Sequence, residues 1–325
     1  MIELTIHILN YRTPDLTLAC LRTLAAERRN YPHFDVILID NASGDDSVRV
    51  LSSALDREGW RDWVRFLPLE RNLGFAGGNN HAMRLALERE DGPPFQLLLN
   101  SDTLVHADCL RTSIEWMKDH PRTGAFSCML RNADGSVQNV CRHFPRPDRE
   151  TLRALGLPYL LPRLFAWADP DDPGWDRETA RGRAVDWIGG AFMLVRSDAI
   201  RQAGLMDERF FFYGEDCEWC HRLWRHGWEV RFDAVPSITH LGGASSDASR
   251  LLDQRRQRLI WRARFQVQRA CYGRWAEYWV RFVYILAFAT RLAWLRLSGQ
   301  QRTPKYQGVR SNLQVLTHSL AAEPS

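Results

Sequence analysis

The segment "FFYGEDCEWCHRLWRHGW", residues 211–228, contains two adjacent acids, two cysteines and two histidines, which are side chains that can take part in chemistry. The pattern predicts a short helix with Glu215 and Asp216 at its N-terminus. A helix dipole favours the ionised form of carboxylates at that end, and a general base must be ionised. Helix capping alone would produce the same pattern, so this segment leaves both roles open.

Cys217 and Cys220 have the C-x-x-C spacing of zinc sites and of redox-active dithiols. A structural zinc site needs four ligands, and no second cysteine pair lies nearby, although neighbouring histidines could complete one. A redox pair is disfavoured because the motif follows two acids and not the end of a first strand. We therefore expect Cys220 and Trp224, at i and i+4, to pack inward on the helix.

A second group of polar side chains directly follows three segments that read as buried strands, "TIHIL", "DVILI" and "QLLL". This group consists of Asn10, Asp40, Asn41, Asn100, Ser101 and Asp102. Asp40 and Asn41 suit hydrogen bonds to a nucleobase or ribose. Asp102 is a candidate ligand of Mg²⁺ or Mn²⁺, since these cations prefer oxygen ligands and take one or two carboxylates plus substrate phosphates. The alternative for Ser101 and Asp102 is capping of a helix that begins near Ala107.

The segment "RNLGFAGGNN", residues 71–80, is a glycine-rich turn that leads into a predicted helix. It lacks the G-x-G-x-x-G spacing of a dinucleotide site and the Gly-Lys-Ser/Thr of a Walker A loop. Its backbone could approach a phosphate, but a plain turn is the alternative. His240 follows a predicted strand, "WEVRF", and a lone histidine of this kind is usually structural.

These residues need elements that hold them in place, and the chain predicts strands that alternate with helices. Thr13 and Pro14 mark the start of the first helix, where the missing N–H of proline costs nothing. The alternation predicts an α/β fold with a mostly parallel sheet whose ligand site lies at the carboxyl ends of the strands. Residues 142–184 are dense in Pro, Arg and Asp and predict a long excursion from the core.

The charge is distributed unevenly over the 325 residues. From Arg250 onward the chain carries 14 Lys and Arg against 3 Asp and Glu. The longest apolar run in this region, residues 282–290, is much shorter than the roughly 20 residues of a membrane span.

The cysteine content predicts where the protein is located. The chain has seven cysteines, an odd number, and no recognisable signal peptide, which indicates a protein of the reducing cytoplasm.

The same C-terminal region predicts a helix with Trp275, Trp279, Phe282 and Leu286 on one face. This face could pack on the preceding domain, with the basic residues in solvent. Alternatively, the aromatic face could enter an anionic membrane surface while the arginines meet lipid phosphates. Nucleic-acid binding is disfavoured because the sequence contains no recognised nucleic-acid module.

Taken in order, seven segments resemble the inverting family 2 glycosyltransferases, and especially their bacterial rhamnosyltransferase-like branch. They are "ILNY", "IDNASGDDS", "RNLGFAGGNN", "LLLNSDT", "DWIGGAFMLVR", "LMDERFFFYGEDCEWCHRLWRHGW" and "ITHLGG". Each motif is weak alone, but their order is specific. The resemblance implies a GT-A domain over residues 1–250, with 142–184 as a variable excursion on the acceptor side. Residues 251–325 would form a helical extension.

The resemblance also implies roles for individual residues. Asp216 matches the catalytic base, and Glu215 would orient the acceptor. Asp102 and His240 would hold Mg²⁺ or Mn²⁺, although Asn100 stands where the family's Asp-x-Asp motif has its first acid. The nucleotide-sugar would be bound by Asn10, Asp40, Asn41, Asn72, Gly77, Gly78, Asn79, Asn80, Asn100 and Ser101.

The implied reaction is transfer of a sugar, with inversion, from a nucleotide-sugar to a hydroxyl of a glycan or polyprenyl-diphosphate-linked acceptor. L-Rhamnose from dTDP-L-rhamnose is the favoured donor group, with UDP-sugars as the alternative. The enzyme would assemble cell-surface polysaccharide in the cytoplasm, peripherally on the inner membrane. A sugar nucleotidyltransferase is disfavoured because "ILNYRTPDL" lacks a glycine-rich loop, and a non-catalytic binding protein because the acids are present.

Overall fold

The computed structural model describes residues 1–169, 175, 177–242 and 250–317. It divides into two compact units, described separately below. The sheet unit consists of Met1–His143 and Gly174–Asp247, and the helical unit of Phe144–Pro173 and Ala248–Ser325. The sequence predicted residues 142–184 as an excursion from the first domain, but the structure assigns most of this segment to the helical unit.

The sheet unit is built on one ten-stranded sheet in the order β3-β2-β1-β4-β11-β6-β12-β5, with β7 paired to β6 and β9 to β12. Its strands are β1 Leu4–Asn10, β2 Phe34–Asp40, β3 Val64–Pro68, β4 Phe95–Asn100, β5 Thr103–Val105, β6 Thr123–Arg131, β7 Val137–Gln138, β9 Arg183–Ala184, β11 Phe192–Arg196 and β12 Glu229–His240. A separate two-stranded sheet pairs β8 Cys141–Arg142 with β10 Trp187–Ile188.

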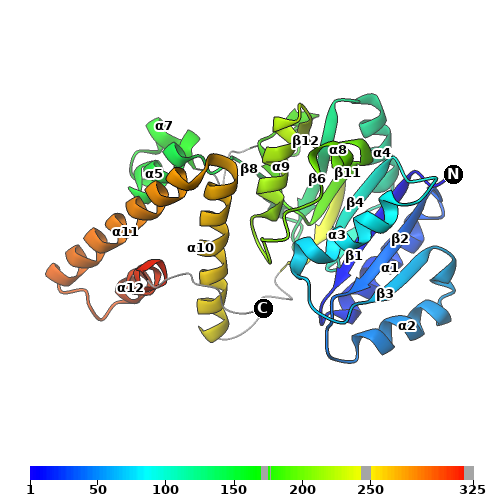
Figure 1. Ribbon diagram of the computed structural model, residues 1–325, viewed down its shortest axis with the longest axis horizontal. Coiled ribbons are helices and arrows are strands. Elements are labelled where there is room, and N and C mark those ends of the chain that lie inside the picture. The colour runs from blue at the N-terminus through cyan, green and yellow to red at the C-terminus, as the bar shows by residue number, and fades with distance from the viewer. Residues whose placement is uncertain (170–174, 176, 243–249, 318–325) are drawn as a thin grey trace. The chain divides into compact units, whose positions relative to one another are not determined.

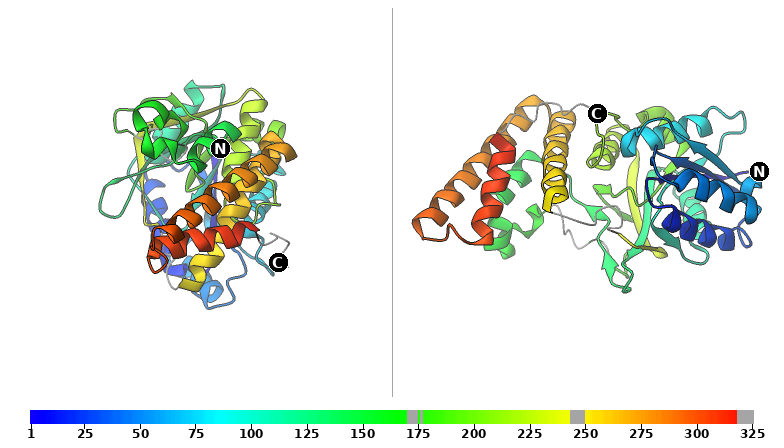
Figure 2. Two further views of the ribbon diagram at one scale, coloured as in Figure 1. Left: turned by 90° about the vertical axis from the view of Figure 1, so that its left-hand side faces the viewer. Right: turned by 90° about the horizontal axis from the view of Figure 1, so that it is seen from below.

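Helices flank the large sheet on both faces, with α1 and α3 on opposite sides (Figures 1 and 2). The helical elements of this unit are α1 Pro14–Glu27, α2 Ser47–Arg57, η1 Trp60–Asp62, α3 Gly74–Leu87, α4 Cys109–Asp119, α8 Ser197–Ala203 and α9 Glu215–Arg225. Helix α1 has Thr13 as its N-cap residue and Pro14 in its first turn, as predicted. The alternation of strands and helices confirms the predicted α/β class.

The pairing directions make the sheet mixed. Strands β1, β2, β3 and β4 are parallel to one another, and β6 is parallel to β12, whereas β11 is antiparallel to both β4 and β6. Strands β1, β2 and β4 are short apolar runs with little exposure, which is the pattern of strands covered on both faces, whereas the edge strand β3 is partly exposed. Their parallel register places Asn10 opposite Asp40 and Leu9 opposite Asn100, so the polar strand ends meet at one edge.

The helical unit has its own apolar core. Its elements are α5 Pro147–Ala154, α6 Leu157–Leu160, α7 Pro162–Phe165, η2 Ala166–Ala168, α10 Arg250–Tyr272, α11 Arg274–Leu297 and α12 Pro304–Thr317. One buried cluster consists of Trp261, Phe265, Val280, Tyr284 and Leu316. Within the described residues, none of the helices combines the length and apolar character needed to cross a membrane.

A buried carboxyl group explains why α5 belongs to the helical unit. Glu150 is 1% exposed, and its Oε2 accepts a hydrogen bond from the Tyr284 hydroxyl at 2.8 Å. The Arg264 guanidinium lies 3.2 Å from the same oxygen. A buried carboxylate needs such partners, so this contact fixes α5 against α10 and α11.

Candidate active site

The ends of β1 and β2 form a buried cluster of hydrogen-bonded polar side chains. Asn10 Nδ2 donates to Asp40 Oδ2 at 2.7 Å, and Asp40 also accepts hydrogen bonds from the Ser43 backbone N–H at 3.0 Å and the Ser43 hydroxyl at 2.6 Å. Asp40 is 1% exposed. These partners make Asp40 the anchor of its own turn, and its predicted contact with a nucleobase stays a prediction.

Asn41 connects this polar cluster to the start of α3. Its Nδ2 donates to Asn72 Oδ1 at 3.0 Å and to the Gly74 carbonyl at 3.1 Å. Gly74 has φ +70°, and a Cβ at this position would lie 2.3 Å from the Phe211 carbonyl oxygen. The Phe75 N–H donates to that same carbonyl at 2.9 Å. Glycine at 74 therefore allows the loop before the two acids to lie directly against α3.

Residues 77–80 do not form the predicted turn, because α3 already begins at Gly74 and includes them. A Cβ on Gly78 would lie 2.5 Å from Leu9 Cδ1, so this glycine lets α3 pack closely on β1. The amide of Asn80 exchanges two hydrogen bonds with the Met206 backbone, at 2.8 and 3.0 Å. These contacts give the segment a packing role, while its predicted contact with a nucleotide stays a prediction.

The predicted metal residues come together through strand pairing. Strand β12 extends beyond the predicted "WEVRF" to His240, which lies opposite Thr103 of the antiparallel strand β5. His240 Nε2 is 3.3 Å from Asp102 Oδ1 and 3.3 Å from Asn100 Nδ2. The alternative that Ser101 or Asp102 caps a helix is wrong, because β5 follows them and α4 begins only at residue 109.

Gln138 determines the tautomer of His240, and so whether its Nε2 atom can act as an acceptor. Gln138 Nε2 donates to Asn132 Oδ1 at 2.9 Å, which orients the amide so that its oxygen faces His240 Nδ1 at 2.6 Å. Nδ1 must then carry a proton, and in the neutral ring Nε2 presents its lone pair. Sequence reasoning missed Gln138, because a glutamine in a two-residue strand carries no local signal of this role.

This donor set fits a divalent cation. In the part of the chain that the structure describes, no three His, Cys, Asp or Glu side chains gather to hold a metal ion. One carboxylate and one imidazole do face each other at Asp102 and His240, and Mg²⁺ commonly completes its shell with water and substrate phosphates. Asp102 and His240 are therefore suited to a cation that arrives with a diphosphate.

A short glycine segment lies between this cluster and the two acids of α9. The Ala191 carbonyl accepts a hydrogen bond from the Asn100 N–H at 3.0 Å. Two residues earlier, a Cβ on Gly189 would lie 4.0 Å from Asp216 Oδ2. Residues 189–191 thus contact both polar groups, since the Gly190 backbone also makes a hydrogen bond that favours the ionised form of Asp216.

Comparison with known families agrees with these features. The sequence model of "Glycosyl transferase family 2" matches residues 5–164, and that of "Glycosyl transferase family group 2" matches residues 175–303. This chain belongs to the family 2 glycosyltransferases.

Two curated relatives of this glycosyltransferase are rhamnosyltransferases. It is 29% identical over 224 residues to an N-acetylglucosaminyl-diphospho-decaprenol L-rhamnosyltransferase of Mycobacterium tuberculosis, a match that covers 67% of this chain and 68% of the relative. It is 30% identical over 180 residues to the rhamnosyltransferase WbbL of Escherichia coli, covering 54% of this chain and 62% of the relative. These matches support the rhamnosyltransferase-like branch.

Solved structures share the fold of this glycosyltransferase. The mannosyltransferase PcManGT from Pyrobaculum calidifontis, in complex with GDP-Man and Mn²⁺, matches with a TM-score of 0.57 and 15% identity over 97% of this chain and 84% of that chain. GalNAc-T7 with UDP, GalNAc and Mn²⁺ matches with a TM-score of 0.54 and 11% identity over 80% of this chain and 48% of that chain. At these identities the likeness establishes the GT-A fold alone.

The ionisation of the two acids differs from the sequence-based expectation. Burial, together with the neighbouring Asp216 carboxylate, raises the pKa of Glu215 to about 8, and Glu215 Oε2 has no hydrogen-bond partner. Burial also raises the pKa of Asp216, against the opposing effects of the Cys217 N–H, which donates to Asp216 Oδ1 at 2.8 Å, and of the Arg142 charge. Desolvation thus outweighs the helix dipole. Of the two acids, Asp216 has the partners that favour its ionised form, namely the Cys217 N–H and the Arg142 charge.

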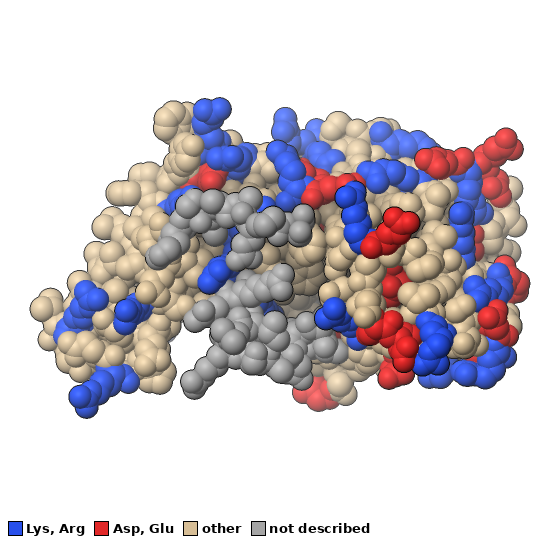
Figure 3. Space-filling view, turned by 60° about the horizontal axis from the view of Figure 1, so that its bottom comes forward, with Lys and Arg blue, Asp and Glu red and all other residues tan. Residues whose placement is uncertain are grey.

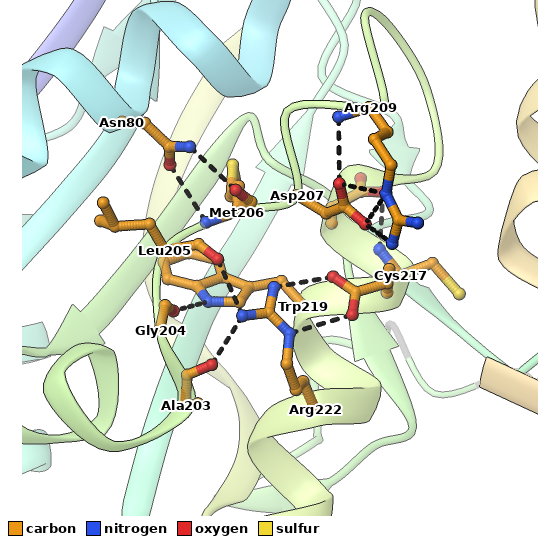
Figure 4. A network of polar contacts seen from close by, with 12 residues as sticks. Asn80, Ala203, Gly204, Leu205, Met206, Asp207, Arg209, Cys217, Trp219 and Arg222 are labelled. Carbon is orange, nitrogen blue, oxygen red and sulfur yellow. Dashed lines mark hydrogen bonds and ion pairs between the residues drawn. The ribbon is translucent and has the colours of Figure 1, made fainter. Parts of the chain in front are cut away.

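The glycosyltransferase holds α9 in place through the loop that follows α8 (Figure 4). Arg222 donates to the carbonyls of Ala203 at 2.6 Å and Leu205 at 2.8 Å, and pairs with Glu218 at 2.7 Å. Trp219 Nε1 donates to the Gly204 carbonyl at 2.8 Å. These bonds fix the helix whose first turn carries the two acids.

The two cysteines of α9 belong to its packed side. Cys220 is fully buried, and Trp224 is partly buried with its Nε1 donating to the Asp186 carbonyl at 3.1 Å. Burial raises the pKa of the Cys220 thiol, which disfavours a thiolate. The packing interpretation of Cys220 and Trp224 is confirmed.

Proposed function

We propose that this glycosyltransferase transfers L-rhamnose from dTDP-L-rhamnose, with inversion, to a hydroxyl group of a glycan carried on a polyprenyl diphosphate lipid. The observation that carries the proposal is the placement of residues 189–191 between the Asn100 to Asp102 turn and Asp216. The turn with Asp102 could hold a cation that neutralises a diphosphate, and Asp216 could accept a proton. These two groups then lie on either side of residues 189–191. The names of the two rhamnosyltransferase relatives support the donor sugar, and the decaprenol relative supports the lipid-linked acceptor.

Asp216 acts as the general base in this proposal. It accepts the proton of the acceptor hydroxyl as the hydroxyl oxygen forms its bond to the anomeric carbon. The bond between that carbon and the diphosphate oxygen breaks at the same time, with attack from the opposite face, so the configuration inverts. Glu215 keeps its proton near neutral pH and donates a hydrogen bond that orients the acceptor, which gives a function to its buried Oε2 atom, for which the described residues supply no hydrogen-bond partner.

Asp102 and His240 would hold Mg²⁺ or Mn²⁺. The cation would supply positive charge to the diphosphate as it leaves. The chain's own contribution is to set the Asp102 carboxylate and the Nε2 lone pair of His240 against one another, with Gln138 holding the imidazole. The Mn²⁺ in the PcManGT and GalNAc-T7 structures supports this proposal.

The nucleotide site divides into contact residues and supporting residues. Asn72, Asn100 and Ser101 keep part of their surface exposed and are proposed to contact the nucleotide-sugar. The other members of the predicted set are nearly fully buried and are proposed to shape the site from behind. They are Asn10, Asp40, Asn41, Gly77, Gly78, Asn79 and Asn80.

A donor screen tests the proposed function. We expect dTDP-L-rhamnose with Mn²⁺ to raise the melting temperature of the enzyme more than UDP-glucose or UDP-N-acetylglucosamine does, since a ligand stabilises the state that binds it. With a synthetic polyprenyl-diphosphate-linked N-acetylglucosamine acceptor, NMR should show a product with inverted anomeric configuration. Stabilisation and turnover with a UDP-sugar alone would instead establish a UDP-sugar-dependent transferase.

The proposed acceptor also places the enzyme at a membrane. We propose that it works in the cytoplasm as a peripheral protein of the membrane that carries its lipid-linked acceptor. The sequence predicted that the aromatic face of the C-terminal helix could attach the enzyme to a membrane. In the structure, the exposed apolar surface of the helical unit is larger than this face.

A further inference from the structure

The outer side of α11 is an exposed apolar stripe. Trp275, Trp279, Phe282, Leu286 and Leu297 are 79%, 51%, 57%, 51% and 90% exposed. Their spacing of three to four residues, extended to eleven between the last two, places them on one side of a helix that runs from Arg274 to Leu297. The other side of the same helix is buried in the core of the helical unit. The exposed stripe is therefore surplus to what folding of this unit requires.

A second exposed apolar segment belongs to the same unit, although it lies more than a hundred residues earlier in the chain. From the end of α5 into η2, the exposed large side chains are Leu155, Tyr159, Leu160, Leu161, Leu164 and Trp167, at 48–72% exposure. Helix α5 packs on α11, and the Trp279 indole N–H donates to the Thr151 hydroxyl at 2.9 Å. We call residues 155–167 and the outer stripe of α11 together the apolar face.

The helical unit that carries the apolar face has a positive net charge, which comes from its C-terminal region. The region from residue 250 onward carries 14 Lys and Arg against 3 Asp and Glu. Exposed cations of the helical unit include Arg163, Arg274, Arg291, Arg302 and Lys305. In Figure 3 this unit shows basic side chains spread over an otherwise uncharged surface, with few acidic ones. Two copies of such a surface would repel one another, which disfavours a homodimer through it.

We propose that the apolar face binds the surface of an anionic lipid bilayer. Large exposed apolar areas mark interaction sites, and apolar side chains flanked by arginines match the acyl and phosphate layers of a membrane interface. The segment 155–167 is then a membrane contact within the excursion that composition predicted for residues 142–184, in place of the acceptor-side role that the resemblance implied. The link to a lipid-linked acceptor rests on the proposed function, whereas the binding of lipid does not.

Vesicle flotation of the full-length enzyme tests this inference. Wild type should float with vesicles that contain phosphatidylglycerol and much less with pure phosphatidylcholine, and high salt should reduce its binding. Two triple variants remove one half of the face each: Tyr159→Ser with Leu160→Ser and Leu164→Ser, and Trp275→Ser with Phe282→Ser and Leu286→Ser. Each should lower partitioning by about 10-fold or more, because each loses three apolar side chains that would enter the membrane interface. The matched control, Val48→Ser with Val235→Ser, removes exposed apolar groups from the sheet unit and should bind like wild type.

Turnover with a short-chain, water-soluble acceptor separates the two proposals. Both triple variants should keep their turnover on that acceptor while losing it on vesicle-embedded acceptor. Equal flotation of wild type and both triple variants would overturn the membrane inference, as would a wild type that forms a dimer through this face and ignores vesicles. Failure of all proteins to use any rhamnosyl donor, with flotation intact, would instead refute the proposed function alone.

Discussion

His240 Nε2 and Asp102 Oδ1 face each other at 3.3 Å because antiparallel pairing of β12 with β5 brings the two segments together. In the neutral ring of His240, the Gln138 contact places the proton on Nδ1 and directs the Nε2 lone pair toward Asp102 Oδ1. Two electron-rich atoms at this distance repel one another unless a cation lies with them. The geometry therefore favours binding of a positive charge.

The first prediction concerns Asp102. Asp102→Asn should weaken Mn²⁺ binding by at least about 10-fold, because a neutral amide oxygen replaces the charged ligand. Electron paramagnetic resonance of free Mn²⁺, with and without nucleoside diphosphate, measures the affinity without any need for turnover. Asp134→Asn, in an exposed turn, is the matched control. Unchanged Mn²⁺ affinity in Asp102→Asn would remove this residue from the metal site.

Gln138 should affect metal binding only through its contact with His240. Gln138→Leu removes the acceptor of the Nδ1 proton and should lower Mn²⁺ affinity by about 10- to 100-fold, the usual cost of losing a partner that orients a metal ligand. Gln138→Glu keeps an acceptor oxygen and should retain most of the affinity. The same Mn²⁺ titration compares the two variants, and a purely structural role would make them equally defective.

Asp216 and Glu215 should respond differently to the same type of change. Asp216→Asn should lower kcat by about 10²- to 10⁴-fold with donor affinity nearly intact, because it removes the base and leaves the nucleotide site in place. Glu215→Gln should cost less, since the neutral amide can still donate a hydrogen bond as a protonated carboxyl does. Steady-state kinetics and donor titration measure both. Near-normal turnover of Asp216→Asn would show that the base is another residue.

Burial of Glu215 should make stability depend on pH. Its folded-state pKa of about 8 exceeds the unfolded value of 4.5, so the folded state holds the proton more tightly. The associated stability is complete below the unfolded pKa and is lost as the pH rises through the folded pKa, by up to about 1.4 kcal/mol per pH unit. Glu215→Gln has no proton to lose, so its free energy of unfolding should fall less between these pKa values. Urea unfolding across that range measures this, and parallel pH curves for both proteins would contradict it.

Local patterns predicted much of this architecture, whereas long-range pairing was not readable from them. The apolar runs before Asn10, Asp40 and Asn100 were correctly predicted as strands, because a buried parallel strand is a short apolar run with a polar end. The antiparallel direction of β11 and the contact of Gln138 with His240 depend on pairing between distant segments, and no local pattern encodes it. The pKa of the two acids was misjudged for a related reason, since their burial comes from packing of α9 and not from their own sequence.

A final prediction tests the packing of α3 on the sheet. Gly78→Ala places a methyl group 2.5 Å from Leu9 Cδ1 and should lower the free energy of unfolding by about 1–3 kcal/mol, a typical cost of overpacking. Gly308→Ala is the matched control in helix α12, because a Cβ there meets no atom within 4 Å. It should be neutral or stabilise by up to about 1 kcal/mol, since alanine is the better helix former. Chemical unfolding of both variants gives the comparison, and equal effects would show that Gly78 is not needed for close packing on β1.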